Sequence, residues 1–193
     1  MGKTIADISM SLDGFVAAAH RTPEELLGRG GEKLHEWAFG QDERNREFLS
    51  ESGATLGALI AGRRTYDDSV RFWGADGPTG AARRPVFVVT HEAPADSPAE
   101  GVYTFVTDGI ESAREKARNA AGDHDVAVMG GAALIQQFLT AGLVDEIGIH
   151  LVPVLFGRGL RLFDNLGELN VALEPVDAAD TPTAVHLRYR IRR

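Results

Sequence analysis

The chain contains no cysteine among its 193 residues. Disulfide bonds, thiol nucleophiles and thiolate metal sites are therefore excluded. No basic segment followed by an apolar one opens the chain, and no window approaches the length of a membrane span. These absences lead us to expect a cytoplasmic protein without a membrane partner.

The chain also lacks any block of lysine or arginine, and its formal net charge is −8 at pH 7. Because an acidic protein repels other polyanions, we expect no nucleic-acid partner. The six histidines include no pair four residues apart, so we expect no metal site. Neither a Walker A sequence nor a complete Gly-x-Gly-x-x-Gly occurs. With 44% hydrophobic and 25% charged residues, the chain has the composition of one globular domain, residues 1–193.

Short apolar runs alternate with helical patterns along most of the chain. Runs of this kind suit strands that are buried on both faces, and their alternation with helices is typical of a parallel sheet. The sequence predicts strands at residues 5–10, 58–61, 85–90 and 126–128, and a helix at 110–121. Residues 18–52 are the least regular part, for which we expect one or two helices over a cleft.

The C-terminal third has a different pattern. Ile147, Ile149 and Leu151 alternate with polar or small residues, and residues 185–191 alternate in the same way. A period of two indicates half-buried strands, which are more typical of antiparallel pairs. The sequence therefore predicts an α/β fold with a mixed, mainly parallel sheet and antiparallel C-terminal strands.

Two glycines stand between the strand at 126–128 and an amphipathic helix. Gly130 and Gly131 have no Cβ, so a ligand can approach their backbone closely. The helix that follows, from Ala132, presents unpaired N–H groups and the positive end of its dipole. This pattern suits a phosphate site, although an ordinary packing turn uses the same residues.

Anion-binding residue types also follow two other predicted strands. Gly62-Arg63-Arg64-Thr65 follows one of them, and Thr90-His91 follows another. Arginine supplies forked donors to phosphate, whereas the alternative is solvated arginines and a helix capped by Thr65. Since ligands bind at the carboxyl ends of strands in open α/β sheets, three such ends together favour a nucleotide site.

Five ordered motifs resemble the dihydrofolate-reductase-like superfamily, and most closely its branch related to the reductase domain of bacterial riboflavin biosynthesis. They are Ser11–Ala17, Gly62–Tyr66, Val88–His91, Val128–Gly131 and Pro153–Gly159. The resemblance implies a three-layer α/β/α fold and NADPH as cofactor. It also implies that Gly62, Arg63, Arg64 and Thr65 meet the cofactor phosphates, Thr90 and His91 the adenosine 2′-phosphate end, Gly130, Gly131 and Ala132 the pyrophosphate, and the loop from Asp13 to Ala17 the nicotinamide.

The chain departs from that superfamily in its acidic residues. Dihydrofolate reductases carry a pterin-binding carboxylate on their first helix, and no acid aligns securely with it here. Asp13 is the leading catalytic candidate, as proton source or substrate anchor, or else it is a turn residue supporting Gly14. Glu47 and Asp42 are further acid candidates. The ligands of the zinc deaminase domain found in bifunctional riboflavin enzymes are missing.

We therefore expect an NADPH-dependent reductase that transfers a hydride to a C=N or C=O bond. Its expected substrate is a small heterocyclic or sugar-derived compound, of the 5-amino-6-ribosylaminouracil-phosphate type. The alternatives are a true dihydrofolate reductase and a non-catalytic NADP-binding regulator. We also expect a homodimer, because the alternating C-terminal strands leave an exposed edge or apolar face. Its interface is predicted at residues 144–163 and the last strand.

Overall fold

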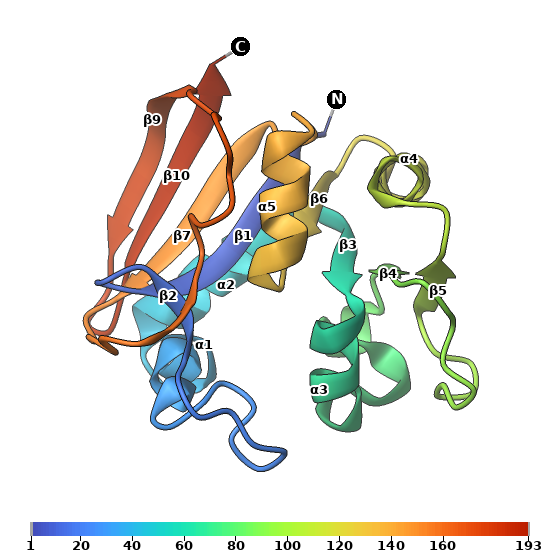
Figure 1. The fold of residues 1–193 in the computed structure, drawn as a ribbon, viewed down its shortest axis with the longest axis horizontal. Helices are drawn as coiled ribbons and strands as arrows, with labels where there is room; N and C mark the ends of the chain where they lie inside the picture. The colour runs from blue at the N-terminus through green and yellow to red at the C-terminus, as the bar shows by residue number, and fades with distance from the viewer. Residues whose placement is uncertain (1, 193) are drawn as a thin grey trace.

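An eight-stranded sheet forms the centre of the computed structural model, which describes residues 2–192 (Figure 1). The strands lie in the order β5-β4-β3-β6-β1-β7-β10-β9. The first six strands in this order are parallel to one another. Strand β10 is antiparallel to both of its neighbours, β7 and β9. Their bounds are β1 Thr4–Ser11, β3 Leu56–Gly62, β4 Val86–Val89, β5 Tyr103–Val106, β6 Asp125–Val128, β7 Glu146–Val152, β9 Ala172–Asp180 and β10 Val185–Arg192.

Helices cover both faces of this sheet, with α5 in front of it and α1 and α2 behind it in Figure 1. A separate two-stranded sheet joins β2 (Phe15–Ala18) to β8 (Gly159–Arg161). The α-helices are α1 Glu36–Phe39, α2 Glu43–Thr55, α3 Arg63–Trp73, α4 Ile110–Ala121 and α5 Ala132–Thr140; the 3₁₀ helices are η1 Gly31–His35, η2 Gly74–Asp76 and η3 Gly80–Ala82.

One face of the sheet carries the largest apolar cluster. Phe138 and Ile135 of α5 pack there with the small residues of α4. The approach of α4 to β3 is close, since a Cβ on Gly57 would lie 2.8 Å from the Cα of Ala121. The opposite face carries a second cluster under α3 and a third under α1 and α2.

The fold predicted from the pattern is confirmed: the sheet is mainly parallel with antiparallel C-terminal strands. The helix predicted at 110–121 has those bounds. Strands β2, β5, β8 and β9 were not predicted. Strand β9 lies at the edge of the sheet and is largely exposed, so it lacks the apolar alternation that burial imposes, and it tolerates Pro175. Within residues 2–192, no helix has the length and apolar character needed to cross a membrane.

Candidate functional site

The carboxyl ends of β3 and β6 lie side by side, and a helix begins at each. The N–H of Gly62 donates to the carbonyl of Gly130 at 2.8 Å, and the N–H of Met129 donates to Ile60 at 3.0 Å. Helix α3 starts directly after Gly62, and α5 starts directly after Gly131. Because the first N–H groups of a helix have no partner within it, this edge concentrates free donors and positive dipole ends. It is therefore suited to an anion.

A turn of two glycines faces a threonine hydroxyl at this edge. Gly130 and Gly131 are joined by a cis peptide bond, and the φ of Gly130 is 132°, a conformation that favours glycine. A Cβ built on either glycine would lie 3.5 Å from Oγ1 of Thr65. Thr65 is the third residue of α3, and Gly62 is its N-cap, so the interpretation of Thr65 as a cap is wrong. Its hydroxyl faces the glycine turn instead, where it can donate a hydrogen bond to a phosphate group.

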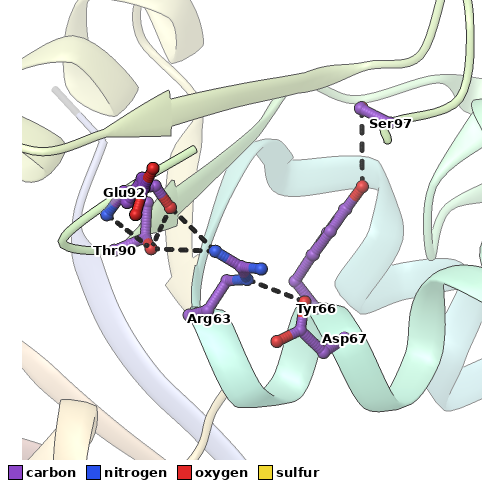
Figure 2. A network of polar contacts seen from close by, with 6 residues as sticks. All are labelled: Arg63, Tyr66, Asp67, Thr90, Glu92 and Ser97. Atoms are coloured by element: carbon purple, nitrogen blue, oxygen red, sulfur yellow. Dashed lines mark hydrogen bonds and ion pairs between the residues drawn. The ribbon is translucent and has the colours of Figure 1, made fainter. Parts of the chain in front are cut away.

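Arg63 lies on the other side of the start of α3, where Figure 2 shows it between Asp67 and the segment after β4. Its Nε donates to Oδ1 of Asp67 at 2.7 Å, and Nη1 donates to the carbonyl of Glu92 at 2.7 Å. Nη1 also lies 3.5 Å from Oγ1 of Thr90, next to the exposed His91. The hydrogen bond to Asp67 raises the pKa of Arg63. The guanidinium is thereby held in one orientation before any ligand arrives.

Arg64 points to a different place, a cleft of about 420 Å³ between α3 and the segment after β2. Within residues 2–192 its guanidinium has no hydrogen-bond or ion-pair partner. Two contacts join the segment after β2 to α3 across this cleft. Arg21 pairs with Asp68, and Nη2 of Arg71 donates to the carbonyl of Pro23 at 3.0 Å. The lining residues are Arg21, Thr22, Pro23, Leu26, Arg64, Asp67, Asp68 and Arg71.

Asp13 lies in the turn after β1, and its carboxylate is fully engaged. It accepts hydrogen bonds from Oγ of Ser11 at 2.6 Å, from the N–H of Gly157 at 2.7 Å and from the N–H of Phe156 at 3.1 Å. The bond from Ser11 holds the pKa of Asp13 below its usual range, against the effect of partial desolvation. The group is therefore ionised at neutral pH and ties the turn to the segment after β7. Ala17, at the end of the same loop, is buried in β2.

The two other acid candidates belong to α2. Glu47 is exposed beside Arg46 and Ser50, in a shallow surface depression. Asp42 caps the helix, because its Oδ1 accepts a hydrogen bond from the N–H of Asn45 at 3.0 Å. The side of α2 that faces the sheet carries Phe48 instead. Neither carboxylate has a described contact with the glycine turn.

Sequence reasoning missed a polar chain on the α1 side of the sheet. Oδ2 of Asp7 lies 3.4 Å from Nε2 of His150, and Nδ1 of His150 lies 2.9 Å from Nδ1 of His186. The indole of Trp37 covers both imidazoles and donates to Oγ of Ser9 at 2.9 Å. The available signal was an aspartate inside an apolar strand. The two histidines had been weighed only as metal ligands.

Comparison with known proteins places these features in a family context. Residues 3–187 match the family model described as the RibD C-terminal domain. The uncharacterized protein YyaP of Bacillus subtilis (strain 168) is 25% identical over 171 residues, which cover 83% of this chain and 80% of YyaP. The uncharacterized protein YwjB of the same organism is 27% identical over 164 residues, covering 85% and 84%.

Solved structures share the fold. A putative riboflavin biosynthesis protein from Shewanella sp. PV-4 has a TM-score of 0.71 and 24% identity, with 99% of each chain covered. The Thermotoga maritima diaminohydroxyphosphoribosylaminopyrimidine deaminase/5-amino-6-(5-phosphoribosylamino)uracil reductase has a TM-score of 0.66 and 15% identity, over 99% of this chain and 57% of that one. Dihydrofolate reductase from Enterococcus faecalis, complexed with NADP(H), has a TM-score of 0.56 and 14% identity over 100% and 98%.

Proposed function

Since the chain belongs to the family of RibD C-terminal domains, we propose that it is an NADPH-dependent reductase acting on a C=N or C=O bond. The observation that carries the proposal is the hydroxyl of Thr65, which faces the glycine turn between two helix starts. Phosphate groups bind at such an edge because free N–H donors and helix dipoles converge there. The fit of these residues to a dinucleotide supports a cofactor site.

In this proposal the residues divide between two parts of the cofactor. Gly130, Gly131, Ala132, Thr65 and the N-cap Gly62 hold the pyrophosphate. Arg63, with Thr90 and His91 beside it, binds the adenosine 2′-phosphate, which NADH lacks. Because Asp67 and the carbonyl of Glu92 already orient the guanidinium, little side-chain entropy is lost on binding. When bound, the cofactor supplies the hydride, and the protein supplies orientation and charge.

Asp13 acts in this proposal by positioning the polypeptide beside the nicotinamide. Its ionised carboxylate holds the loop from Asp13 to Ala17 against Phe156 and Gly157. An anion with three hydrogen-bond donors is a poor proton source, so the anchoring role is favoured. We assign no role in the chemistry to Glu47, because it is exposed on α2.

Arg64 lines a cleft in which Arg21 already pairs with Asp68, and its own guanidinium, unpaired within residues 2–192, supports a small substrate that carries an anionic group. Arginine recognises phosphate through paired donors, and Arg64 has no partner within the described residues. We therefore propose a phosphorylated, sugar-derived heterocycle, of the kind named for the Thermotoga relative. A true dihydrofolate reductase and a non-catalytic NADP-binding regulator are the alternatives.

The test is NADPH oxidation by the purified protein with 5-amino-6-(5-phosphoribosylamino)uracil, compared with dihydrofolate. We expect turnover of the first compound, and turnover of dihydrofolate lower by orders of magnitude, since lost general-acid catalysis alone costs about 10²–10⁴-fold. Rapid turnover of dihydrofolate would favour the first alternative. NADPH binding without turnover of either compound would favour the regulator.

We further propose that the chain is a single domain that forms a homodimer. Strand β9 is an edge strand, and several large apolar side chains are exposed in residues 155–163, around β8, and in residues 171–185, on or beside β9. Exposed edges of this kind are commonly covered by a second copy of the chain. The exposed residues are Leu155, Leu160, Phe163, Val171, Leu173, Val176 and Val185.

A further inference from the structure

A reductase needs a proton as well as a hydride, and the residues described so far do not provide one. Hydride addition to C=N or C=O leaves an electron pair on the heteroatom, which must take up a proton. Asp13 is held as an anion by three donors, and Glu47 is exposed on α2. Another residue must therefore donate the proton.

Asp7 is an acidic side chain close to the glycine turn. Ala6 pairs with Val128, so the next residues in the two parallel strands, Asp7 and Met129, are neighbours on one face. Met129 packs with the cluster under α3, and it directly precedes Gly130. The glycine turn therefore begins one residue beyond the neighbour of Asp7. The carboxyl group thus lies between α3 and α1, beside the proposed cofactor site.

This carboxyl group remains accessible although β1 is a central strand. Its side chain is 35% exposed to solvent. Room for it comes from Gly148 on β7, where a Cβ would lie 2.3 Å from Oδ1 of Asp7. Burial raises the pKa of Asp7, but the charge and hydrogen bond of His150, with Arg188 and His186, lower it further than burial raises it. A substrate covering Asp7 would remove the remaining solvent and favour the protonated form.

From Asp7 a line of hydrogen-bonding atoms leads to the β9–β10 turn. His150 joins Asp7 to His186 through its two ring nitrogens, at 3.4 Å and 2.9 Å. Nε2 of His186 lies 3.5 Å from Oγ1 of Thr181, in the half-buried turn between β9 and β10. The stacked ring of Phe48 and the indole of Trp37 cover the imidazoles, so water has little access to the middle of the line.

The ring nitrogens of His150 and His186 and the carboxyl group of Asp7 can be fully hydrogen-bonded to one another in two ways. Where two Nδ1 atoms face each other, one must donate and the other must accept. If His186 donates to His150, then His150 directs its Nε2 proton at an ionised Asp7. If His150 donates to His186, then Asp7 carries a proton and directs it at Nε2 of His150. Both states keep both histidines neutral, and they differ by one proton.

We propose that Thr181, His186, His150 and Asp7 form a proton relay that delivers to the substrate the proton consumed by reduction. The inference rests on the proposed reductase function. The hydride brings the electron pair from the reduced nicotinamide to the substrate carbon, and the substrate is reduced by two electrons. The heteroatom takes its proton from Asp7. Asp7 acquires that proton beforehand, in the state in which it starts ionised: Nε2 of His150 gives its proton to Asp7, and Nδ1 of His150 takes one from Nδ1 of His186. Nε2 of His186 takes a proton from solvent through Oγ1 of Thr181, which converts the first state into the second.

The first test needs no turnover and uses the fluorescence of Trp37. The chain has two tryptophans, so Trp73→Phe leaves Trp37 as the sole reporter, with imidazole ring centres 4.3 and 4.7 Å away. A protonated imidazole quenches a neighbouring indole, so fluorescence should fall as pH falls. The other charged or titratable groups near the pair are Arg188 on β10 and His35 on η1.

In this background Asp7→Asn should lower the midpoint of the fluorescence change by about one pH unit or more, because the carboxylate that stabilises an imidazolium is lost. The control Asp123→Asn removes an exposed charge after α4 and should leave the midpoint unchanged. An unchanged midpoint in Asp7→Asn would show that the groups are not coupled and would overturn the relay.

The second test uses NADPH oxidation with 5-amino-6-(5-phosphoribosylamino)uracil. Asp7→Asn should lower kcat by about 100-fold or more with an unchanged dissociation constant for NADPH. Thr181→Val should lower kcat with little change in KM, and Thr181→Ser should restore it. If the wild type is inactive, the proposed function fails and the fluorescence titration alone decides the coupling. If the wild type is active and Asp7→Asn retains full kcat, the relay is wrong while the reductase function stands.

Discussion

Oδ2 of Asp13 accepts a hydrogen bond of 2.7 Å from the N–H of Gly157, a residue 144 positions further along the chain. The bond joins the turn after β1 to the segment after β7. The second oxygen of the carboxylate accepts a bond of 2.6 Å from Ser11. Asp13 therefore fixes two segments that the proposed cofactor site requires.

The lowered pKa of Asp13 predicts how stability depends on pH. A group whose folded pKa is depressed contributes stability above its unfolded value, here 3.8, and that contribution is lost as pH falls through the folded value. Asp13→Asn should therefore lower Tm at pH 7, and the difference from wild type should shrink below pH 3.8. Thermal unfolding of both proteins across this range tests the sign. A constant difference at all pH values would contradict it.

The proposed contact of Arg63 with the adenosine 2′-phosphate predicts that the protein prefers NADPH to NADH. Losing a charge-assisted contact costs on the order of 1.5–3 kcal/mol, so Arg63→Ala should weaken NADPH binding about tenfold or more. NADH, which has no 2′-phosphate, should be affected much less. Calorimetry with both cofactors measures the difference, and Arg118→Ala, on the distant helix α4, is the matched control. Equal affinity of the wild type for NADPH and NADH would refute the assignment.

A substitution at Gly131 tests whether the glycine turn binds the pyrophosphate. Its φ is −86°, which other residues adopt, and an added Cβ would meet only Oγ1 of Thr65, at 3.5 Å. Gly131→Val should therefore fold but lose NADPH binding, because the branched side chain occupies the approach of the phosphates. Gly53→Ala, where a Cβ meets nothing within 4 Å, should bind normally. Normal binding by folded Gly131→Val would identify an ordinary packing turn.

The three ion pairs of Glu146 predict that removal of its charge lowers the free energy of unfolding. Its carboxylate is 2% exposed and lies within 3.6 Å of the side-chain cations of Lys3, Arg188 and Arg190. Glu146→Gln removes the anion shared by these three cations, which are partly exposed, and should cost on the order of 1.5–3 kcal/mol of unfolding free energy. Glu174→Gln removes a more exposed pair with Arg192 and should cost about 1 kcal/mol or less. Urea unfolding compares the two, and equal small losses would contradict the prediction.

The exposed apolar residues near β9 predict the oligomeric state. Light scattering at micromolar concentration should give twice the 20.8 kDa mass of one chain. Replacing an exposed apolar residue of β9 with a charge, as in Val176→Asp, should shift the protein toward the monomer without unfolding it. A monomeric wild type would reject the dimer.

Much of the fold was determined by local patterns in the sequence. The strand before Gly130 and the helix after Gly131 follow from an apolar run, two glycines and a helical repeat, all within about a dozen residues. The antiparallel β10 follows from its alternation. Strand β9 was missed because an exposed edge strand has no buried face to enforce such a pattern.

The tertiary structure alone decided which side chains meet. Local pattern places Thr65 near the start of a helix, but only the pairing of β3 with β6 turns its hydroxyl toward Gly130 and Gly131. Asp7 and His150 are 143 residues apart, and the register of β1 with β7 brings them together over Gly148. The local pattern of residues in the sequence specifies each strand. Contacts across a sheet depend on strand order and register, which are set by packing of the whole core.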